Sequence, residues 1–221
     1  MSQKGNIVLV LRSGGDFSME DVFLLTHHLR KQSNDDVRIT CLFDKVKQGW
    51  DLHGFSLRPL PCEGWRGWWS KMNLFSPELE QYRPFLYLDL DTAVVGHYTE
   101  LMNQGNHFIT LEDFYHDGKL ASGLMWIPRD SIKVKQVWDE WIKNPGAHMK
   151  RFRGDQDFIR TVTTADLFWQ DVTPKVSSFK PKTGKLNQLP EGVSVVCFHG
   201  KPRIWQAAGS VRWVRKYTDY D

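Results

Sequence analysis

The order of apolar runs in the first 43 residues restricts the fold more than any other feature of the sequence. The run NIVLVL (6–11) has the length of a strand and leads into Gly14 and Gly15. The next segment, SMEDVFLLTHHLRKQ (18–32), repeats apolar residues at helical spacing, and VRITCLF (37–43) is again strand-like. A strand, helix, strand order predicts a parallel sheet covered by helices, so we expect an α/β fold.

The rest of the chain continues this alternation within what we expect to be a single domain. Two segments rich in Gly, Pro or Lys, 44–66 and 175–190, are predicted loops. Functional residues are expected near the carboxyl ends of the strands, where open α/β sheets bind their ligands. The sequence predicts helices at 67–82, 101–105, 130–144 and 154–162, and strands at 84–90, 107–111, 122–128 and 192–200.

Tryptophan is frequent in this chain, with 10 residues. Trp138 and Trp141 stand at helical spacing, which predicts that they belong to the core. Trp65, Trp68 and Trp69 cluster near the start of a predicted helix, where they suit either the core or a platform for an acceptor sugar.

Composition excludes several classes of protein. No run reaches the roughly 18 consecutive apolar residues of a membrane span, and the first apolar run has no leader-type cleavage site, so we expect a cytoplasmic protein. Three cysteines at wide spacing argue against a disulfide framework or a four-ligand zinc site. The net charge of +3 comes from scattered Lys and Arg, which does not indicate nucleic-acid binding but is compatible with a polyphosphate ligand.

Two acids, Asp89 and Asp91, stand where the apolar run that starts at Phe85 stops. On an extended strand these positions point to the same face, so the two carboxylates would lie side by side. Like charges about 4 Å apart repel by about 4 kcal/mol near a protein surface. A hard dication such as Mg²⁺ or Mn²⁺ would relieve this repulsion and could bridge to phosphate oxygens. The alternative is a strand end with two solvated acids, and the tripeptide alone favours neither.

The context of the acids resembles a known family. RPFLYLDLDTAVVG is preceded by GWWSKMNLF and followed in order by SGLMWI, GDQDFI and VVCFHGKPRIW. This set, spread over about residues 6–205, is similar to the retaining nucleotide-sugar glycosyltransferases of the A-type fold, the family that includes glycogenin and bacterial galactosyltransferases. RSGGDF at the first turn and CFHGKP near the end resemble a bacterial and phage branch of that family.

The resemblance implies a fold and a reaction. The fold is the single-domain A-type α/β fold with a mostly parallel central sheet flanked by helices, in which about residues 1–95 form the nucleotide-binding half and about 96–221 the sugar and acceptor half. The reaction is transfer of a hexose from a nucleotide sugar, expected to be a UDP-hexose, to an acceptor that the sequence does not identify, with retention at the anomeric carbon.

The resemblance also assigns a metal site. Asp89 and Asp91 would hold Mn²⁺ or Mg²⁺ on the donor diphosphate. The third ligand of the relatives is a His, and strict alignment puts Cys197 in its place, with His199 two positions further on. Imidazole suits Mn²⁺ better than a thiolate does, so we favour His199 and keep Cys197 or water as the alternative. A lone Cys is otherwise most often a small buried hydrophobe.

The remaining site residues are assigned by motif. Asp155 and Gln156 are the expected catalytic pair facing the anomeric carbon, although Asp155 could equally cap the helix that follows. Asp113 is a weaker candidate for the sugar pocket. The nucleotide-sugar donor is expected to contact Leu11, Arg12, Ser13, Asp16, Phe17, Lys71, Asp89, Leu90, Asp91, Ser122, Gly123, Gly200 and Lys201. Arg203 is a further cation that would neutralise the diphosphate of the donor.

Two other functions fit the sequence. Ala121, Cys197 and Ile204 depart from the family pattern, which suits a sugar or nucleotide-sugar binder of the same fold without catalysis. Paired aspartates also suit metal-dependent phosphoryl transfer, a reaction that needs further acids for a second metal or a P-loop.

Overall fold

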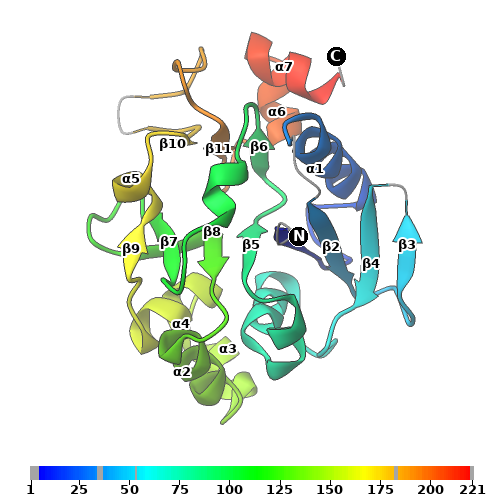
Figure 1. Ribbon diagram of the computed structural model, residues 1–221, viewed down its shortest axis with the longest axis vertical. Coiled ribbons are helices and arrows are strands. Elements are labelled where there is room, and N and C mark those ends of the chain that lie inside the picture. The colour runs from blue at the N-terminus through cyan, green and yellow to red at the C-terminus, as the bar shows by residue number, and fades with distance from the viewer. Residues whose placement is uncertain (1–4, 34–36, 53, 182–183, 220–221) are drawn as a thin grey trace.

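A central sheet of eight strands organises the part of the chain that the computed structural model describes, residues 5–33, 37–52, 54–181 and 184–219 (Figure 1). Its strands follow the order β3-β4-β2-β1-β5-β8-β7-β9. All of them except β3 and β8 run in one direction, so the sheet is mostly parallel. The strands are β1 (Asn6–Leu11), β2 (Arg38–Phe43), β3 (Trp50–Leu52), β4 (Phe55–Pro59), β5 (Phe85–Leu88), β7 (Ile109–Glu112), β8 (Leu120–Ile127) and β9 (Leu167–Phe168).

A smaller sheet stands beside the first. It consists of β10 (Val176–Ser178), β11 (Val195–Cys197) and β6 (Thr92–Val94), in which β6 pairs antiparallel with β11. The chain leaves the main sheet at the end of β5 and enters the smaller sheet at β6 only a few residues later. The turn between them carries Asp89 and Asp91, which therefore stand at the junction of the two sheets.

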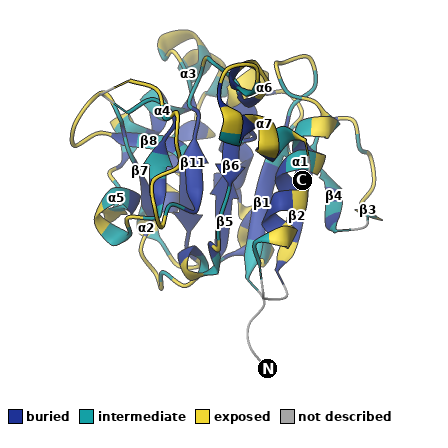
Figure 2. Cartoon of the chain, turned by 90° about the horizontal axis from the view of Figure 1, so that it is seen from above, coloured by how far each residue is buried: buried dark blue, intermediate teal, exposed yellow. Residues whose placement is uncertain are grey.

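Helices cover both faces of the main sheet. Side chains alternate along β1, so Ile7 and Leu9 pack toward α1, whereas Val8 packs on the opposite side among residues of η1, α2 and α4. Figure 2 shows the central strands as the buried layer of the molecule. The helices are α1 (Met19–Lys31), the 3₁₀ helices η1 (Gly67–Phe75), η2 (Pro77–Tyr82) and η3 (Thr99–Met102), α2 (Ile132–Trp141), α3 (Pro145–Arg151), α4 (Asp155–Val162), α5 (Trp169–Val172), α6 (Ile204–Ala208) and α7 (Arg212–Thr218).

None of the helices within the described residues is both long and apolar enough to cross a lipid bilayer. The three cysteines are free thiols. The core assignment of Trp141 is confirmed, since its side chain is fully buried and stacks on Trp69 with ring centroids 5.2 Å apart.

Several predicted boundaries are wrong. The predicted loop 44–66 contains β3 and β4. The sequence does not indicate β4, because the alternation of buried Phe55 and Leu57 with more exposed neighbours is short and lies among Gly and Pro. The predicted loop 175–190 contains β10, and 67–82 forms two 3₁₀ helices instead of one α-helix. The strand predicted to run to Leu90 ends at Leu88.

His28 connects helix α1 to the C-terminal helix α7. Its ring is buried and stacks on Tyr217 with centroids 3.8 Å apart, and Nε2 lies 2.7 Å from the Tyr217 carbonyl oxygen. Burial lowers the pKa of His28 below 6.5, the hydrogen bond to Tyr217 opposes this, and the nearby charges of His27 and Lys31 add to the lowering. The folded protein therefore holds His28 neutral at a pH where the unfolded chain would protonate it.

This difference predicts a contribution of His28 to acid sensitivity. Because the folded state binds fewer protons than the unfolded state, the free energy of unfolding falls as the pH drops below about 6.5. His28→Gln should reduce the slope of that free energy against pH between 7 and 5 by up to about 1.4 kcal/mol per pH unit. Urea unfolding at a series of pH values measures the slope. His97→Gln, at an exposed histidine, is the control, and equal slopes for both variants would contradict the prediction.

Candidate active site

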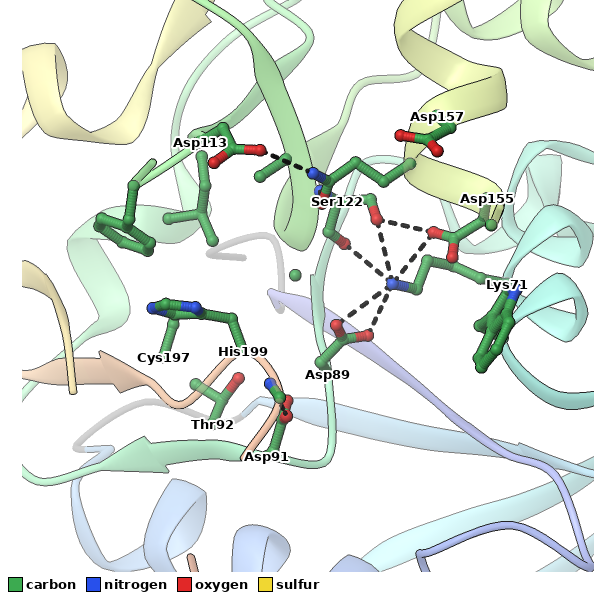
Figure 3. A pocket seen from close by; sticks show the side chains of 18 of the residues that line it. Lys71, Asp89, Asp91, Thr92, Asp113, Ser122, Asp155, Asp157, Cys197 and His199 are labelled. Carbon is green, nitrogen blue, oxygen red and sulfur yellow. Dashed lines mark hydrogen bonds and ion pairs between the residues drawn. The ribbon is translucent and has the colours of Figure 1, made fainter. Parts of the chain in front are cut away.

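Two neighbouring cavities open where β5 ends. The β5 cavity, of about 520 Å³, is lined by Trp68, Lys71, Asp89, Asp91, Thr92, Leu111, Asp113, Phe114, Tyr115, Ala121, Ser122, Gly123, Arg153, Gly154, Asp155, Gln156, Asp157, Cys197, His199, Gly200 and Arg203 (Figure 3). The β1 cavity, of about 430 Å³, is lined by Val10, Arg12, Gly14, Gly15, Asp16, Phe17, Gly67, Trp68, Lys71, Tyr87, Asp89, Leu90, Asp91 and Arg203. The walls of both cavities include Trp68, Lys71, Asp89, Asp91 and Arg203, which therefore stand between them.

Lys71 joins the walls of the β5 cavity. Its Nζ lies 2.9 Å from Asp89 Oδ1, 3.2 Å from Asp155 Oδ2 and 3.1 Å from Ser122 Oγ (Figure 3). Burial alone would lower the pKa of Lys71, but the charges of Asp155 and Asp89 outweigh it and raise the pKa, so the ammonium stays charged. One cation thereby links η1, the end of β5, β8 and the start of α4.

The pKa of Asp89 is raised even though Lys71 lies beside its carboxylate. Burial raises its pKa, the charge of Lys71 acts against the rise, and the charges of Asp91 and Asp155 add to it. The Tyr87 hydroxyl donates a hydrogen bond to Asp89 Oδ1. The carboxylate is therefore held ionised by its contacts with Lys71 and Tyr87, and removal of either would favour its protonation.

Asp91 has a different partner from Asp89. Arg203 Nη1 lies 2.5 Å from Asp91 Oδ2, and the amide N–H of Gly200 donates to the same oxygen over 3.4 Å. β5 ends at Leu88, so the two acids follow the strand and do not lie on it as expected. Their repulsion is offset by two separate side-chain cations.

His199 lies at the far wall of the β5 cavity, held by aromatic contacts. Its ring stacks on Phe114 at 4.9 Å and meets Tyr115 edge-on at 5.5 Å, while Nε2 lies 2.5 Å from Ser178 Oγ. Burial and the charge of Lys180 lower the pKa of His199 to about 4, so the imidazole is neutral at pH 7. Its φ of +31° is uncommon for a residue other than Gly, a conformation that clusters at functional sites.

The expected catalytic pair lies at the start of α4. Asp155 Oδ2 accepts a hydrogen bond from Ser122 Oγ over 2.6 Å, and its side chain is buried against Lys71. Gln156 is held at both ends, since Nε2 donates to Asp113 Oδ2 over 3.0 Å and Oε1 accepts from the Ser122 amide over 3.3 Å. Gly154 is the N-cap residue of α4, so the alternative role of Asp155 as the cap is wrong.

The first turn after β1 is fixed by an acid that the sequence patterns do not single out. Asp44, which follows β2, accepts hydrogen bonds from the Ser13 amide over 2.7 Å and the Ser13 hydroxyl over 2.5 Å. Arg12 Nη1 lies 3.3 Å from the same carboxylate. Burial opposes ionisation of Asp44, but these contacts outweigh it and lower the pKa. The position of Asp44 directly after a parallel strand is the sequence feature that could have identified it as a site residue.

Most of the predicted site residues meet at these two cavities, and three do not line either. Leu11 packs into the core, Ser13 turns its hydroxyl to Asp44, and Lys201 is exposed with its carbonyl oxygen bound to Lys180 Nζ at 2.6 Å. Lys71, Asp89 and Asp91 face both cavities. Ser122, Gly123, Asp155, Gln156, His199 and Gly200 line the β5 cavity, and Arg12, Asp16, Phe17 and Leu90 line the β1 cavity.

Trp68 is exposed, unlike the other two tryptophans of its sequence cluster. Trp65 and Trp69 belong to the core, whereas Trp68 is 61% exposed at the rim of both cavities. A Cβ atom at Gly154 would lie only 3.2 Å from Trp68 Nε1, so the missing side chain leaves room for the indole over the start of α4. Sequence spacing alone does not distinguish this tryptophan from its buried neighbours.

The donor atoms at the junction suit Mn²⁺ or Mg²⁺ in kind. Asp89 and Asp91 offer carboxylate oxygens, and His199 offers a neutral imidazole. Cys197 suits the ion poorly, because burial and the nearby Asp91 and Asp89 charges raise the pKa of its thiol. Across the described ranges no three Asp, Glu, His or Cys side chains are grouped so that they could hold an ion. An ion bound by Oδ2 of Asp91 would have to displace Arg203 from that oxygen.

Solved structures of glycosyltransferases share this fold. The glycosyltransferase GlyE of Streptococcus pneumoniae TIGR4 has a TM-score of 0.68 at 14% identity, over 98% of this chain and 60% of that one. The galactosyltransferase LgtC, solved in complex with donor and acceptor sugar analogs, has a TM-score of 0.64 at 12% identity, over 97% and 94%. The bifunctional glycosyltransferase WbbM has a TM-score of 0.62 at 10% identity, over 100% and 52%.

The structural likeness establishes the class of fold. No protein-family model matches the chain, and no curated protein matches it in sequence. This chain spans about 60% of the length of the GlyE chain. The predicted α/β fold with a mostly parallel central sheet is confirmed, and it is the fold of the A-type glycosyltransferases.

The Lys71 contacts predict a large effect on stability. Lys71→Met leaves two carboxylates, Asp89 and Asp155, without their shared cation, and should lower the free energy of unfolding at pH 7 by about 3–5 kcal/mol. The loss should shrink at pH 5, because burial raises the pKa of Asp89 to about 6 and its protonation removes the repulsion. Urea unfolding measures both values. Lys143→Met, which breaks an exposed pair with Glu140, is the control, and an equally small effect at Lys71 would contradict the prediction.

Proposed function

We propose that this chain transfers a hexose from a nucleotide sugar, with UDP as the nucleotide, to an acceptor, with retention at the anomeric carbon and with a bound dication. The observation that carries the proposal is the cluster of the buried Lys71, Asp155 and Ser122 with the half-buried Asp89 in the β5 cavity, at the end of a parallel strand. The fold shared with GlyE and LgtC supports it. LgtC was solved with donor and acceptor sugar analogs.

The β1 cavity is the proposed site of the nucleotide. Phe17 supplies an aromatic face, and Arg12 and Asp16 supply charge at its wall. Asp44 holds the turn in place through Ser13 and Arg12, which makes it a positioning residue for the nucleotide. This arrangement suits the division of the chain into a nucleotide half, about 1–95, and a sugar and acceptor half, about 96–221.

The β5 cavity is the proposed site of the sugar. Lys71 and Ser122 fix the carboxylate of Asp155, so its negative charge can stabilise an oxocarbenium-like centre at the anomeric carbon. Gln156 cannot turn freely, because Asp113 and the Ser122 amide hold both ends of its amide group. The exposed indole of Trp68 at the rim provides a flat apolar surface for an acceptor sugar ring.

The leaving diphosphate would lie between the cavities. Arg203 faces both of them and has the planar set of donors that matches phosphate oxygens. Mn²⁺ or Mg²⁺, held by Asp89, Asp91 and His199, would supply Lewis-acid stabilisation of the leaving group. Neutral His199 is in the protonation state that a metal ligand requires.

A nucleotide-sugar screen tests the proposal. A UDP-hexose should raise the melting temperature in the presence of Mn²⁺ and less so in its absence, because only ligands of the native state stabilise it. Release of UDP measures turnover. Asp155→Asn, which keeps the shape of the side chain, should lower turnover by about 100-fold or more while UDP binding persists.

The outcomes separate the competing functions. Binding of a UDP-sugar without turnover under any acceptor condition would favour a non-catalytic binder. Transfer of a phosphoryl group instead of a sugar would favour the phosphoryl-transfer alternative. No thermal shift with any nucleotide sugar, with or without Mn²⁺, would reject the proposed donor.

A further inference from the structure

Arg203 connects two acids from opposite walls of the site. Its Nη1 contacts Asp91 Oδ2, whereas Nη2 and Nε lie 3.0 Å and 3.3 Å from Asp16 Oδ2. Asp16 belongs to the turn after β1 and Asp91 to the turn after β5. The side chain of Arg203 therefore lines both the β1 and the β5 cavity, and we call the region between these two cavities the passage.

Aromatic contacts hold the guanidinium in this position. Its central carbon lies 4.8 Å from the centroid of the Phe17 ring, and Trp205 packs edge-on against the same ring at 5.8 Å. The Arg203 side chain keeps only 19% of its surface exposed. The guanidinium is thus held by two carboxylates and one aromatic ring, and does not form a simple exposed surface pair.

The backbone around Arg203 is anchored independently of these contacts. Its amide N–H donates to Gln206 Oε1 over 2.8 Å at the start of α6. Lys180 Nζ donates to the carbonyl oxygens of His199 and Lys201 over 2.9 Å and 2.6 Å, which fixes the preceding loop. A change of partner by Arg203 can therefore occur through its side chain alone.

Asp91 cannot serve Arg203 and a dication equally well. Arg203 already occupies Oδ2 of Asp91, and a guanidinium beside a bound dication is repelled by it. Asp16, the other acid, is 55% exposed and could lose its partner to water at little cost. A diphosphate in the passage would offer Arg203 oxygens that accept its parallel N–H groups.

We propose that Arg203 occupies Asp91 in the free protein and leaves it for the diphosphate of the nucleotide, so that dication binding and diphosphate binding are coupled through this one side chain. The inference rests on the proposed function, because it requires a nucleoside diphosphate and a dication at the same junction. In the free protein the dication is then a weak ligand, and the nucleotide strengthens its binding.

Mn²⁺ binding to the nucleotide-free protein tests this exchange. Arg203→Met should bind Mn²⁺ about 10-fold more tightly than the unaltered protein in the absence of nucleotide, since Asp91 is already released. Arg203→Lys, which keeps the charge but lacks the planar fork, should show a smaller increase. Electron paramagnetic resonance of free Mn²⁺ gives the dissociation constants without any turnover.

A charge-matched control separates local exchange from net charge. Arg153→Met removes a cation from the wall of the same cavity, at a residue that makes no ion pair with Asp91 in the described structure, and should change Mn²⁺ affinity less than twofold. Equal increases for Arg153→Met and Arg203→Met would overturn the proposal. Should Arg203→Met fail to fold by circular dichroism, the comparison of Arg203→Lys with Arg153→Met decides in the same way.

Measurements with UDP distinguish failure of this inference from failure of the proposed function. If the unaltered protein binds UDP together with Mn²⁺ and Arg203→Met leaves the affinity of the free protein for Mn²⁺ unchanged, the exchange is refuted and the proposed function stands. If neither UDP nor Mn²⁺ binds the unaltered protein, both are refuted. Tighter Mn²⁺ binding by Arg203→Met, with a smaller gain on adding UDP than in the unaltered protein, supports the exchange.

Discussion

The buried ammonium of Lys71 is the interaction on which the site depends. Taking a charge out of water is costly, and the cost is met here because Lys71 lies between Asp89 and Asp155 and beside the Ser122 hydroxyl. The partners come from different elements, so the ion cluster also fixes how η1, β5, β8 and α4 meet. The shape of the β5 cavity and the electrostatics of its acids thus have one origin.

The transition between the two sheets explains why the acids meet different cations. β5 is buried on both faces and ends at Leu88, and the chain then turns into β6, which pairs with β11. The turn leaves Asp89 on the side of the main sheet, near Lys71, and brings Asp91 to the segment after β11, near Arg203. A continued strand would have kept both acids on one face and closer to the same neighbours.

Sequence reasoning recovers the parts of this arrangement that periodicity or a motif encodes. Strands β1 and β5 consist almost entirely of apolar residues, β2 is mostly apolar, and the motifs select Lys71, Asp89 and Asp155. The short strand β4 is hidden because its alternation is brief and ends on Pro59. The pairing of Arg203 with Asp91 joins distant segments through a guanidinium whose direction no local pattern specifies, and the same holds for Asp44 and Ser13.

The two cations of the acidic pair differ in how firmly they are held, and this difference suits different tasks. Lys71 is 9% exposed and lies between two acids, so its departure would leave both carboxylates without this cation, Asp155 in a buried position. Arg203 is more exposed, and one of its two acids, Asp16, is open to solvent. An incoming anion competes more easily for Arg203 than for Lys71. Under the proposed function, Lys71 is the fixed neutralising charge beside the sugar and Arg203 is the replaceable one between the two cavities.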